Sequence, residues 1–245
     1  MSPGRIGLQA TLNGQYTKEW HAAVPVSLEE LVQDAVACVA AGARAIHLHP
    51  RDSEGLERLD ADVINTVVSW VQSACGVPVG VSTGAWIEPD LARRLTLVQE
   101  WRAPDYASVN LSEGGAASMM QALLEAGVGI EAGVWSVEDA DRLAATRLGE
   151  MVTRILIEPV EVSSASALTV IDEIHQALDR YGFTAPRLQH GDGEATWILL
   201  EDAVRRGIDT RIGLEDTIYE PDGNLTTGNA ALVRAACHLG AGLLT

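Results

Sequence analysis

Two histidines separated by one residue, His47 and His49, are the side chains of this chain whose type and spacing best suit chemistry. They lie at the end of a short apolar run, residues 44–48, that predicts a buried strand. Side chains alternate between the two faces of a strand, so both imidazoles point the same way. Two imidazoles on one face can share a divalent ion such as zinc; the alternative is a pair of core histidines at a strand end.

A second group of ionisable residues, Arg211, Glu215 and Asp216, lies late in the chain. A catalytic zinc takes three protein ligands, so either acid can complete the histidine pair while the other transfers a proton. The alternatives are a solvated loop acid at Glu215 and a helix N-cap at Asp216. Arg211 falls inside a predicted strand, where it needs a carboxylate or an anionic substrate as partner. His190 ends another predicted strand and is a candidate for a further ligand or an acid, against a structural role.

Polar residues also end two of the middle strands. Ser82 and Thr83 offer hydroxyls and backbone N–H groups that suit a carboxylate, or else they only cap the helix that follows. Asn110 is either a hydrogen-bonding group in a pocket or a satisfied turn residue. Three tryptophans follow strand ends, where they either wall an apolar pocket or pack between helices: Trp86, Trp135 and Trp197.

Short β-branched runs alternate with longer amphipathic stretches from end to end. The predicted strands are 6–11, 43–49, 78–82, 106–111, 129–133, 153–158, 187–190 and 210–213. The amphipathic helical stretches are 28–41, 61–74, 116–126, 137–148, 166–180, 195–206 and 228–239. Start and stop signals include Ser27 followed by Glu30, and the glycines Gly42 and Gly127 after a last turn.

Strict alternation of the eight strands with helices means parallel strands joined by helical crossovers. Units of about 30 residues fit a closed (β/α)8 TIM barrel better than an open doubly wound sheet. No Gly-x-Gly-x-x-Gly follows the first strand, which argues against a dinucleotide-binding sheet. We therefore predict one α/β domain over residues 1–245.

The active sites of such barrels lie at the carboxyl ends of the strands. The polar and ionisable residues named above collect at those ends, whereas Ala, Gly, Val and Pro dominate the strand starts. This asymmetry favours an enzyme over a scaffold.

Composition excludes several classes of partner. The chain has 245 residues, 47% of them apolar, and a formal net charge of −17. Nucleic acids and anionic membranes attract basic surfaces, so neither is an expected partner. No apolar stretch reaches the roughly 20 residues of a membrane helix, and no secretory signal begins the chain. Three widely spaced cysteines indicate a reducing cytoplasm. An anionic substrate would need a local cluster of arginines.

Four motifs in order resemble the β-keto acid cleavage enzyme family. They are His-Leu-His-Pro-Arg-Asp at 47–52, Val-Ser-Thr-Gly at 81–84, Val-Asn-Leu at 109–111 and Arg-Ile-Gly-Leu-Glu-Asp at 211–216. The segments 16–18 and 24–27 are also similar to that family. The resemblance implies a zinc-binding (β/α)8 barrel that condenses a β-keto acid with acetyl-CoA, giving acetoacetate and a new acyl-CoA. It also implies a homo-oligomer, a tetramer or larger.

The resemblance also implies roles for particular residues. The zinc ligands would be His47, His49 and Glu215; the general base Asp216, with Arg211 as its charge partner; and the substrate-binding residues Ser82, Thr83 and Asn110. Asn13 and Gln15 stand near the first strand end, where we expect a substrate contact. Two alternatives stay open: a zinc-dependent hydrolase on the same barrel, and a metal-loaded barrel that binds a small acid without turnover.

Overall fold

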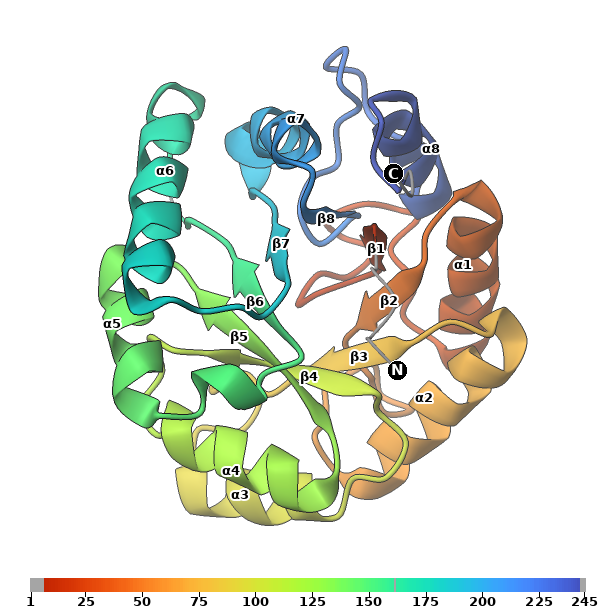
Figure 1. Ribbon diagram of the computed structural model, residues 1–245. Coiled ribbons are helices and arrows are strands. Elements are labelled where there is room, and N and C mark those ends of the chain that lie inside the picture. Colours follow the sequence, from red (N-terminus) through yellow and green to blue (C-terminus); the bar gives the residue numbers. More distant parts are fainter. Residues whose placement is uncertain (1–6, 161, 243–245) are drawn as a thin grey trace.

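The computed structural model, which describes residues 7–160 and 162–242, is a closed barrel of parallel strands (Figure 1). The strands follow one another in sequence order, and β1 pairs with both β2 and β8 to close the barrel. The strands are β1 Leu8–Thr11, β2 Ala45–Leu48, β3 Val79–Ser82, β4 Tyr106–Asn110, β5 Gly129–Val134, β6 Arg154–Ile157, β7 Arg187–Gln189 and β8 Asp209–Ile212. The predicted (β/α)8 TIM barrel is confirmed.

Helices surround the barrel (Figure 1). They are α1 Leu28–Ala41, α2 Ala61–Cys75, α3 Leu91–Gln99, α4 Ala116–Ala126, α5 Val137–Thr146, α6 Ser164–Tyr181, α7 Thr196–Arg206 and α8 Asn229–His238. Seven of them match the predicted stretches to within a few residues. The helix α3 was missing from those stretches; it is short, and Arg94 occupies its buried face where an apolar side chain is expected.

The predicted start and stop signals of the helices are confirmed. The Ser27 hydroxyl accepts from the Glu30 backbone N–H at 3.2 Å, and the Glu30 carboxylate accepts from the Ser27 N–H at 3.1 Å. This capping box satisfies N–H groups that the first turn of α1 leaves free. At the other end Gly42 adopts φ +129°, and a Cβ there would lie 2.5 Å from the Cys237 sulfur. Gly127 ends α4 in the same way, with φ +77°.

A layer of polar side chains fills the barrel below the strand ends. Glu131 of β5 forms a buried ion pair with Arg154 of β6, whose guanidinium carbon lies 4.9 Å from the centre of the Tyr106 ring. Glu131 is the third residue of β5, and its side chain is fully buried inside the barrel. Gly80 makes room for this layer, because a Cβ there would lie 1.9 Å from Tyr106. The layer closes the barrel beneath the strand ends.

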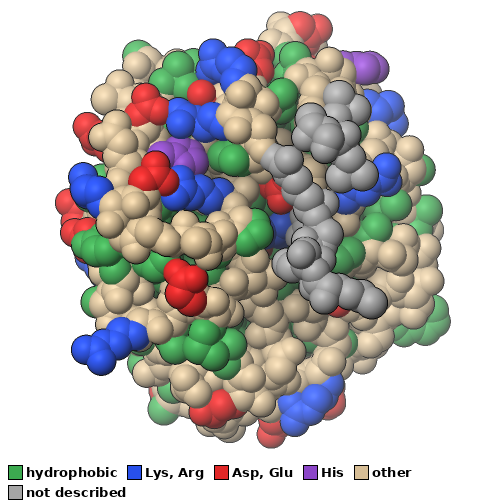
Figure 2. Space-filling view, viewed as in Figure 1, with side chains coloured by type: hydrophobic (Ala, Val, Ile, Leu, Met, Phe, Trp, Pro, Cys, Tyr) green, Lys and Arg blue, Asp and Glu red, His purple; other side chains and the backbone are tan. Residues whose placement is uncertain are grey.

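The surface carries charges of both signs. The chain has 34 acidic and 17 basic residues, and Figure 2 shows both kinds interspersed on the face in view. Within the part of the chain that the structure describes, no helix has the length and apolar character needed to cross a membrane.

Candidate active site

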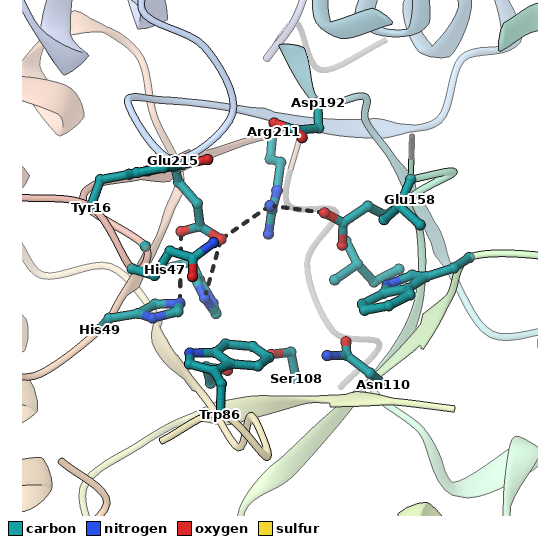
Figure 3. Close-up of a pocket in the computed structure, with 16 residues that line it drawn as sticks. Tyr16, His47, His49, Trp86, Ser108, Asn110, Glu158, Asp192, Arg211 and Glu215 are labelled. Carbon is teal, nitrogen blue, oxygen red and sulfur yellow. Dashed lines mark hydrogen bonds and ion pairs between the residues drawn. The ribbon is translucent and has the colours of Figure 1, made fainter. Parts of the chain in front are cut away.

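A pocket of about 340 Å³ opens at the carboxyl ends of the strands (Figure 3). Ser108 and Asn110 line it, two and four residues beyond Tyr106 along β4. On the β6 side Glu158 lines it, four residues beyond Arg154. Side chains two residues apart on a strand face the same way. The inward-facing side chains of β4 and β6 therefore continue from the buried polar layer to the open pocket. This end of the barrel is where barrel enzymes hold their active sites.

Three side chains on one wall of this pocket form a candidate metal site. Each of these residues, His47, His49 and Glu215, offers one ligand atom, and the three atoms lie within 4.8 Å of one another. The Nε2 atoms of both histidines lie 3.9 Å from the Glu215 carboxylate, one facing each oxygen (Figure 3). The predicted same-face orientation of the histidines is therefore present, and the Glu215 carboxylate faces both rings. We call these three residues the ligand triad.

The donor set of the ligand triad fits a divalent ion such as zinc. The Glu215 Oε2 atom is buried and has no hydrogen-bond partner among the described residues, because the 3.9 Å that separates it from His49 Nε2 is too long for a hydrogen bond. Burial, and then the neighbouring His49, lower the pKa of His47 well below its ordinary value, which keeps that imidazole neutral. Imidazole nitrogens and a carboxylate oxygen are ligands that zinc takes in catalytic sites.

The loop after β1 packs against the ligand triad. The Asn13 side chain accepts from the His49 N–H at 2.9 Å and donates to the His49 carbonyl at 3.0 Å. Asn13 therefore holds the backbone of a ligand rather than contacting substrate. Gly14 adopts φ +50°, and a Cβ there would lie 2.6 Å from Glu215 Cγ. Glycine is needed here both for the backbone conformation and for the space that Glu215 occupies.

Glu57 supports the ligand triad from outside, and it was not among the residues predicted to take part in the chemistry. Its Oε2 atom lies 3.1 Å from His49 Nδ1 and accepts a hydrogen bond from Trp86 Nε1 at 3.2 Å. The Trp86 ring stacks on the His49 ring, with 6.2 Å between centroids. A carboxylate on Nδ1 leaves Nε2 free to bind a metal, an arrangement typical of metal-ligating histidines. The clue in the sequence was weak: Glu57 follows the histidine motif by a few residues in a loop.

We expect Glu57→Gln to weaken metal binding by about 10- to 100-fold, because an amide is a poorer acceptor for His49 Nδ1–H than a carboxylate. The dissociation constant for zinc, measured by competition with a chromogenic chelator, tests this. Glu54→Gln is the matched control, since Glu54 is an exposed acid of the same loop. Equal affinity in the two variants would show that Glu57 does not position the ligand.

Arg211 and Asp216 form a buried pair beside the ligand triad. The Arg211 Nη2 atom donates to Asp216 Oδ1 at 2.7 Å and to Glu215 Oε1 at 3.1 Å. The second Asp216 oxygen accepts from the Thr11 hydroxyl at 2.7 Å. Burial raises the pKa of Asp216 to about 6, although Arg211 and His190 favour its ionised form. Of the two predicted kinds of partner for Arg211, the structure shows a protein carboxylate. Asp216 is the residue after Glu215 of the ligand triad.

Acidic groups also lie across the pocket from the ligand triad. Glu158 Oε2 lies 3.5 Å from His190 Nε2, and Glu158 Oε1 lies 3.8 Å from Arg211 Nη2. The other ring nitrogen of His190 lies 3.7 Å from Asp216. His190 is fully buried, so it bridges two carboxylates rather than reaching the ligand triad. Asp192 also lines the pocket on this side.

The predicted substrate-binding residues divide into two groups. Ser82 and Asn110 line the pocket. Thr83 does not line it, because its hydroxyl donates to the Ser108 carbonyl at 2.8 Å and its side chain is buried. Ser108, which sequence reasoning missed, lines the pocket instead.

The three tryptophans also separate. Trp86 and Trp135 line the pocket, which is the first of the two alternatives predicted for them. Trp197 is outside it, with its indole N–H donated to the Tyr219 carbonyl at 2.9 Å.

The fold and the site together define the class of protein. It is a (β/α)8 barrel with a candidate metal-centred active site at its strand ends, formed by two histidines, a glutamate and an arginine–aspartate pair. Comparison with known families then identifies the group: the pattern of the β-keto acid cleavage enzymes matches residues 5–243, and the chain belongs to this family. A curated relative is the 3-keto-5-aminohexanoate cleavage enzyme of Fusobacterium nucleatum. It is 24% identical over 246 residues, covering 94% of this chain and 89% of the relative.

Solved structures agree on the fold. A complex of ObcA with oxaloacetate superposes with a TM-score of 0.68 at 16% identity, covering 88% of this chain and 63% of that one. This chain therefore spans less than two thirds of that relative's length. The 3-dehydroquinate dehydratase of Geobacillus kaustophilus gives 0.64 at 10% identity, covering 96% and 91%. At such identities the likeness concerns the barrel alone.

Proposed function

We propose that this protein is a zinc-dependent enzyme that condenses a β-keto acid with acetyl-CoA, giving acetoacetate and a new acyl-CoA. The observation that carries the proposal is the meeting of two groups in one place: the ligand triad, and the Arg211–Asp216 pair that touches it through Glu215. Cleavage of a β-keto acid is what the family does. A metal site beside a buried base is what carbon–carbon cleavage next to a carbonyl requires.

The ligand triad would hold the zinc ion, through His47, His49 and Glu215. A zinc ion, when bound, supplies a Lewis acid that polarises the keto oxygen of the substrate. Ser82 and Asn110, with Ser108 where Thr83 was expected, are the neutral hydrogen-bonding groups we assign to the substrate carboxylate.

Asp216 is the proposed base. It removes a proton from C2 of the keto acid, and Arg211 holds it ionised through a 2.7 Å contact. The C2 carbanion attacks the thioester carbonyl of acetyl-CoA, and the CoA thiolate leaves. The thiolate then adds to the original keto carbon, the bond from that carbon to C2 breaks, and Asp216 returns its proton to C2. Acetoacetate and a new acyl-CoA result, with every atom and proton accounted for.

The test is consumption of 3-oxohexanoate by the zinc-loaded protein with and without acetyl-CoA. We expect consumption only when acetyl-CoA is present, with acetoacetate and butanoyl-CoA formed in equal amounts, because the thioester is the acceptor of the carbanion. Mass spectrometry of both products checks this. Consumption without acetyl-CoA would support the hydrolase instead, and binding without turnover would support the non-catalytic barrel.

The homo-oligomer and its tetrameric form stay proposals that rest on the family resemblance, and the cytoplasmic location stays a proposal that rests on the three widely spaced cysteines. Light scattering and cell fractionation test them.

A further inference from the structure

Asn229, the first residue of α8, is a fully buried asparagine that joins segments far apart in the chain. Its Oδ1 atom accepts from the Leu214 N–H at 2.6 Å. Its Nδ2 atom donates to the Leu12 carbonyl at 2.7 Å and to Asp34 Oδ2 at 2.6 Å. Asn229 therefore uses its carbonyl and both of its N–H groups on partners within the protein.

These partners fix the orientation of the Asn229 amide. Burial raises the pKa of Asp34 to about 6, so this carboxyl is mostly ionised at neutral pH and offers only acceptors. The Leu12 carbonyl is also an acceptor, so both N–H groups of the amide must face these two oxygens. An amide turned the other way would set an N–H against the Leu214 N–H. The Asn229 oxygen is therefore held toward Leu214.

The two backbone groups that Asn229 joins stand next to the ligand triad in the chain. Leu214 directly precedes Glu215, which is the carboxylate of the triad. Leu12 directly precedes Asn13, whose side chain holds the backbone of a histidine ligand. One buried side chain thus ties the end of β8, which carries a ligand, to the end of β1, which supports another.

The backbone on the other side of Glu215 is held as well. The Asp216 carbonyl accepts from the Gly193 N–H at 2.9 Å and from the Thr196 hydroxyl at 3.2 Å. Glu215 is therefore the one residue between two fixed peptide groups, the Leu214 N–H held from α8 and the Asp216 carbonyl held from the start of α7. Its side chain begins from a backbone that is fixed on both sides.

The turn ahead of α8 directs the Asn229 side chain inward. Gly228 adopts φ +143°, a conformation that favours glycine, and its N–H is donated to Thr226 Oγ1 at 3.3 Å. Helix α8 lies beside α1, the helix that carries Asp34 (Figure 1). The chain therefore enters α8 with Asn229 facing the barrel and the neighbouring helix rather than solvent.

We propose that Asn229 is a positioning residue of the metal site, which holds the Glu215 carboxylate opposite the histidines before a metal ion binds. The inference rests on the proposed function only in taking the ligand triad as a metal site, and it assumes nothing about the substrate. Ligands held in place in advance bind an ion more tightly, because no further ordering of the chain is needed on binding.

The test compares zinc binding by two alanine variants. Asn229→Ala should raise the dissociation constant for zinc, measured by competition with a fluorescent chelator, about tenfold. Asn65→Ala is the matched control, because Asn65 of α2 accepts the N–H groups of Arg102 and Ala103, at 2.8 Å and 3.0 Å, away from the pocket. Thermal unfolding should show a loss of stability in both variants, but only Asn229→Ala should lose zinc affinity.

The possible results separate this inference from the proposed function. If the parent binds zinc and the two alanine variants bind it as tightly as the parent, Asn229 has only a structural role and this inference alone fails. If the parent binds no zinc, the proposed function and this inference both fail.

A milder variant covers the case in which Asn229→Ala does not fold. Asp34→Asn combined with Asn229→Asp exchanges the amide and the carboxylate between the two positions. It keeps an acceptor for the Leu214 N–H and a hydrogen bond between residues 34 and 229, and it loses only the donor to the Leu12 carbonyl. We expect its dissociation constant for zinc to rise about threefold. A parental constant in this variant, with Asn229→Ala unfolded, would overturn the proposal.

Hydrogen exchange of the metal-free parent tests the positioning without any substitution. Mass spectrometry of the peptide that covers residues 213–217 should show protection before zinc is added, because the Leu214 N–H is already donated to Asn229. The exposed loop 221–225 is the reference for fast exchange. Exchange of residues 213–217 as fast as that of this loop would show that the Glu215 segment is not held in advance, and the proposal would be wrong.

Discussion

Asp216→Asn is expected to lower kcat by about a thousandfold while the protein keeps its metal. General bases contribute about 10²–10⁴-fold, and an amide of the same shape cannot take a proton. The metal stays because the ligand is Glu215, the neighbouring residue. Steady-state kinetics with 3-oxohexanoate and acetyl-CoA, together with metal analysis of the same sample, measure both quantities. A kcat within a few-fold of the parent in a metal-loaded sample would show that another group is the base.

The pH profile of the parent enzyme gives a second measure of Asp216. Burial raises the pKa of this carboxyl to about 6. The base must be ionised to act, so kcat/KM should fall as the pH drops through that value. A bound cation lowers the pKa of a neighbouring acid, so in the metal-loaded enzyme the limb lies at or below about pH 6. Asp222→Asn, at an exposed acid in the loop after β8, is the control and should keep the parental profile.

His49→Ala is expected to remove both bound zinc and activity. The ligand triad has three protein ligands, and a catalytic zinc is seldom held by two. The loss should exceed the roughly 10–100-fold that removal of an outer hydrogen-bonding partner costs. Metal content by elemental analysis after dialysis, with kcat measured on the same sample, checks this.

His238→Ala is the matched control, because His238 is exposed at the end of α8. It should keep the parental zinc content, and dialysis of the parent against a chelator should reproduce the loss seen in His49→Ala. A His49→Ala protein with full zinc content would rule out the ligand triad as the metal site.

Local patterns in the sequence were enough to predict the fold and part of the site. The alternation of apolar runs and amphipathic stretches predicted the barrel, since strand and helix periods depend only on near neighbours in the chain. The same two-residue period placed His47 and His49 on one face. The strand-end rule then indicated Glu215 and Asp216, although which of them faces the histidines stayed open on the residues alone.

Other features depend on contacts between segments far apart in the chain. Thr83 follows the strand next to that of Ser108, and the contact between them turns its hydroxyl away from the pocket. Glu57 carries no motif of its own, and its role follows from its distance to His49. A strand period says which face a side chain occupies, but not which side chain from another element stands opposite.

The sequence by itself determined the architecture, the shared face of the histidine pair and the end of the barrel where the chemistry lies. The residues alone left open which acid faces both histidines and what pairs with Arg211, although the family resemblance implied Glu215 and Asp216. The tertiary structure shows Glu215 facing both histidines, Arg211 paired with Asp216, and acidic side chains on the opposite wall of the pocket. The physical reason is closure: β8 pairs with β1, and β1 pairs with β2. This pairing brings the end of β8 beside the histidines. Side chains that are far apart in sequence therefore come into contact only once the barrel has formed.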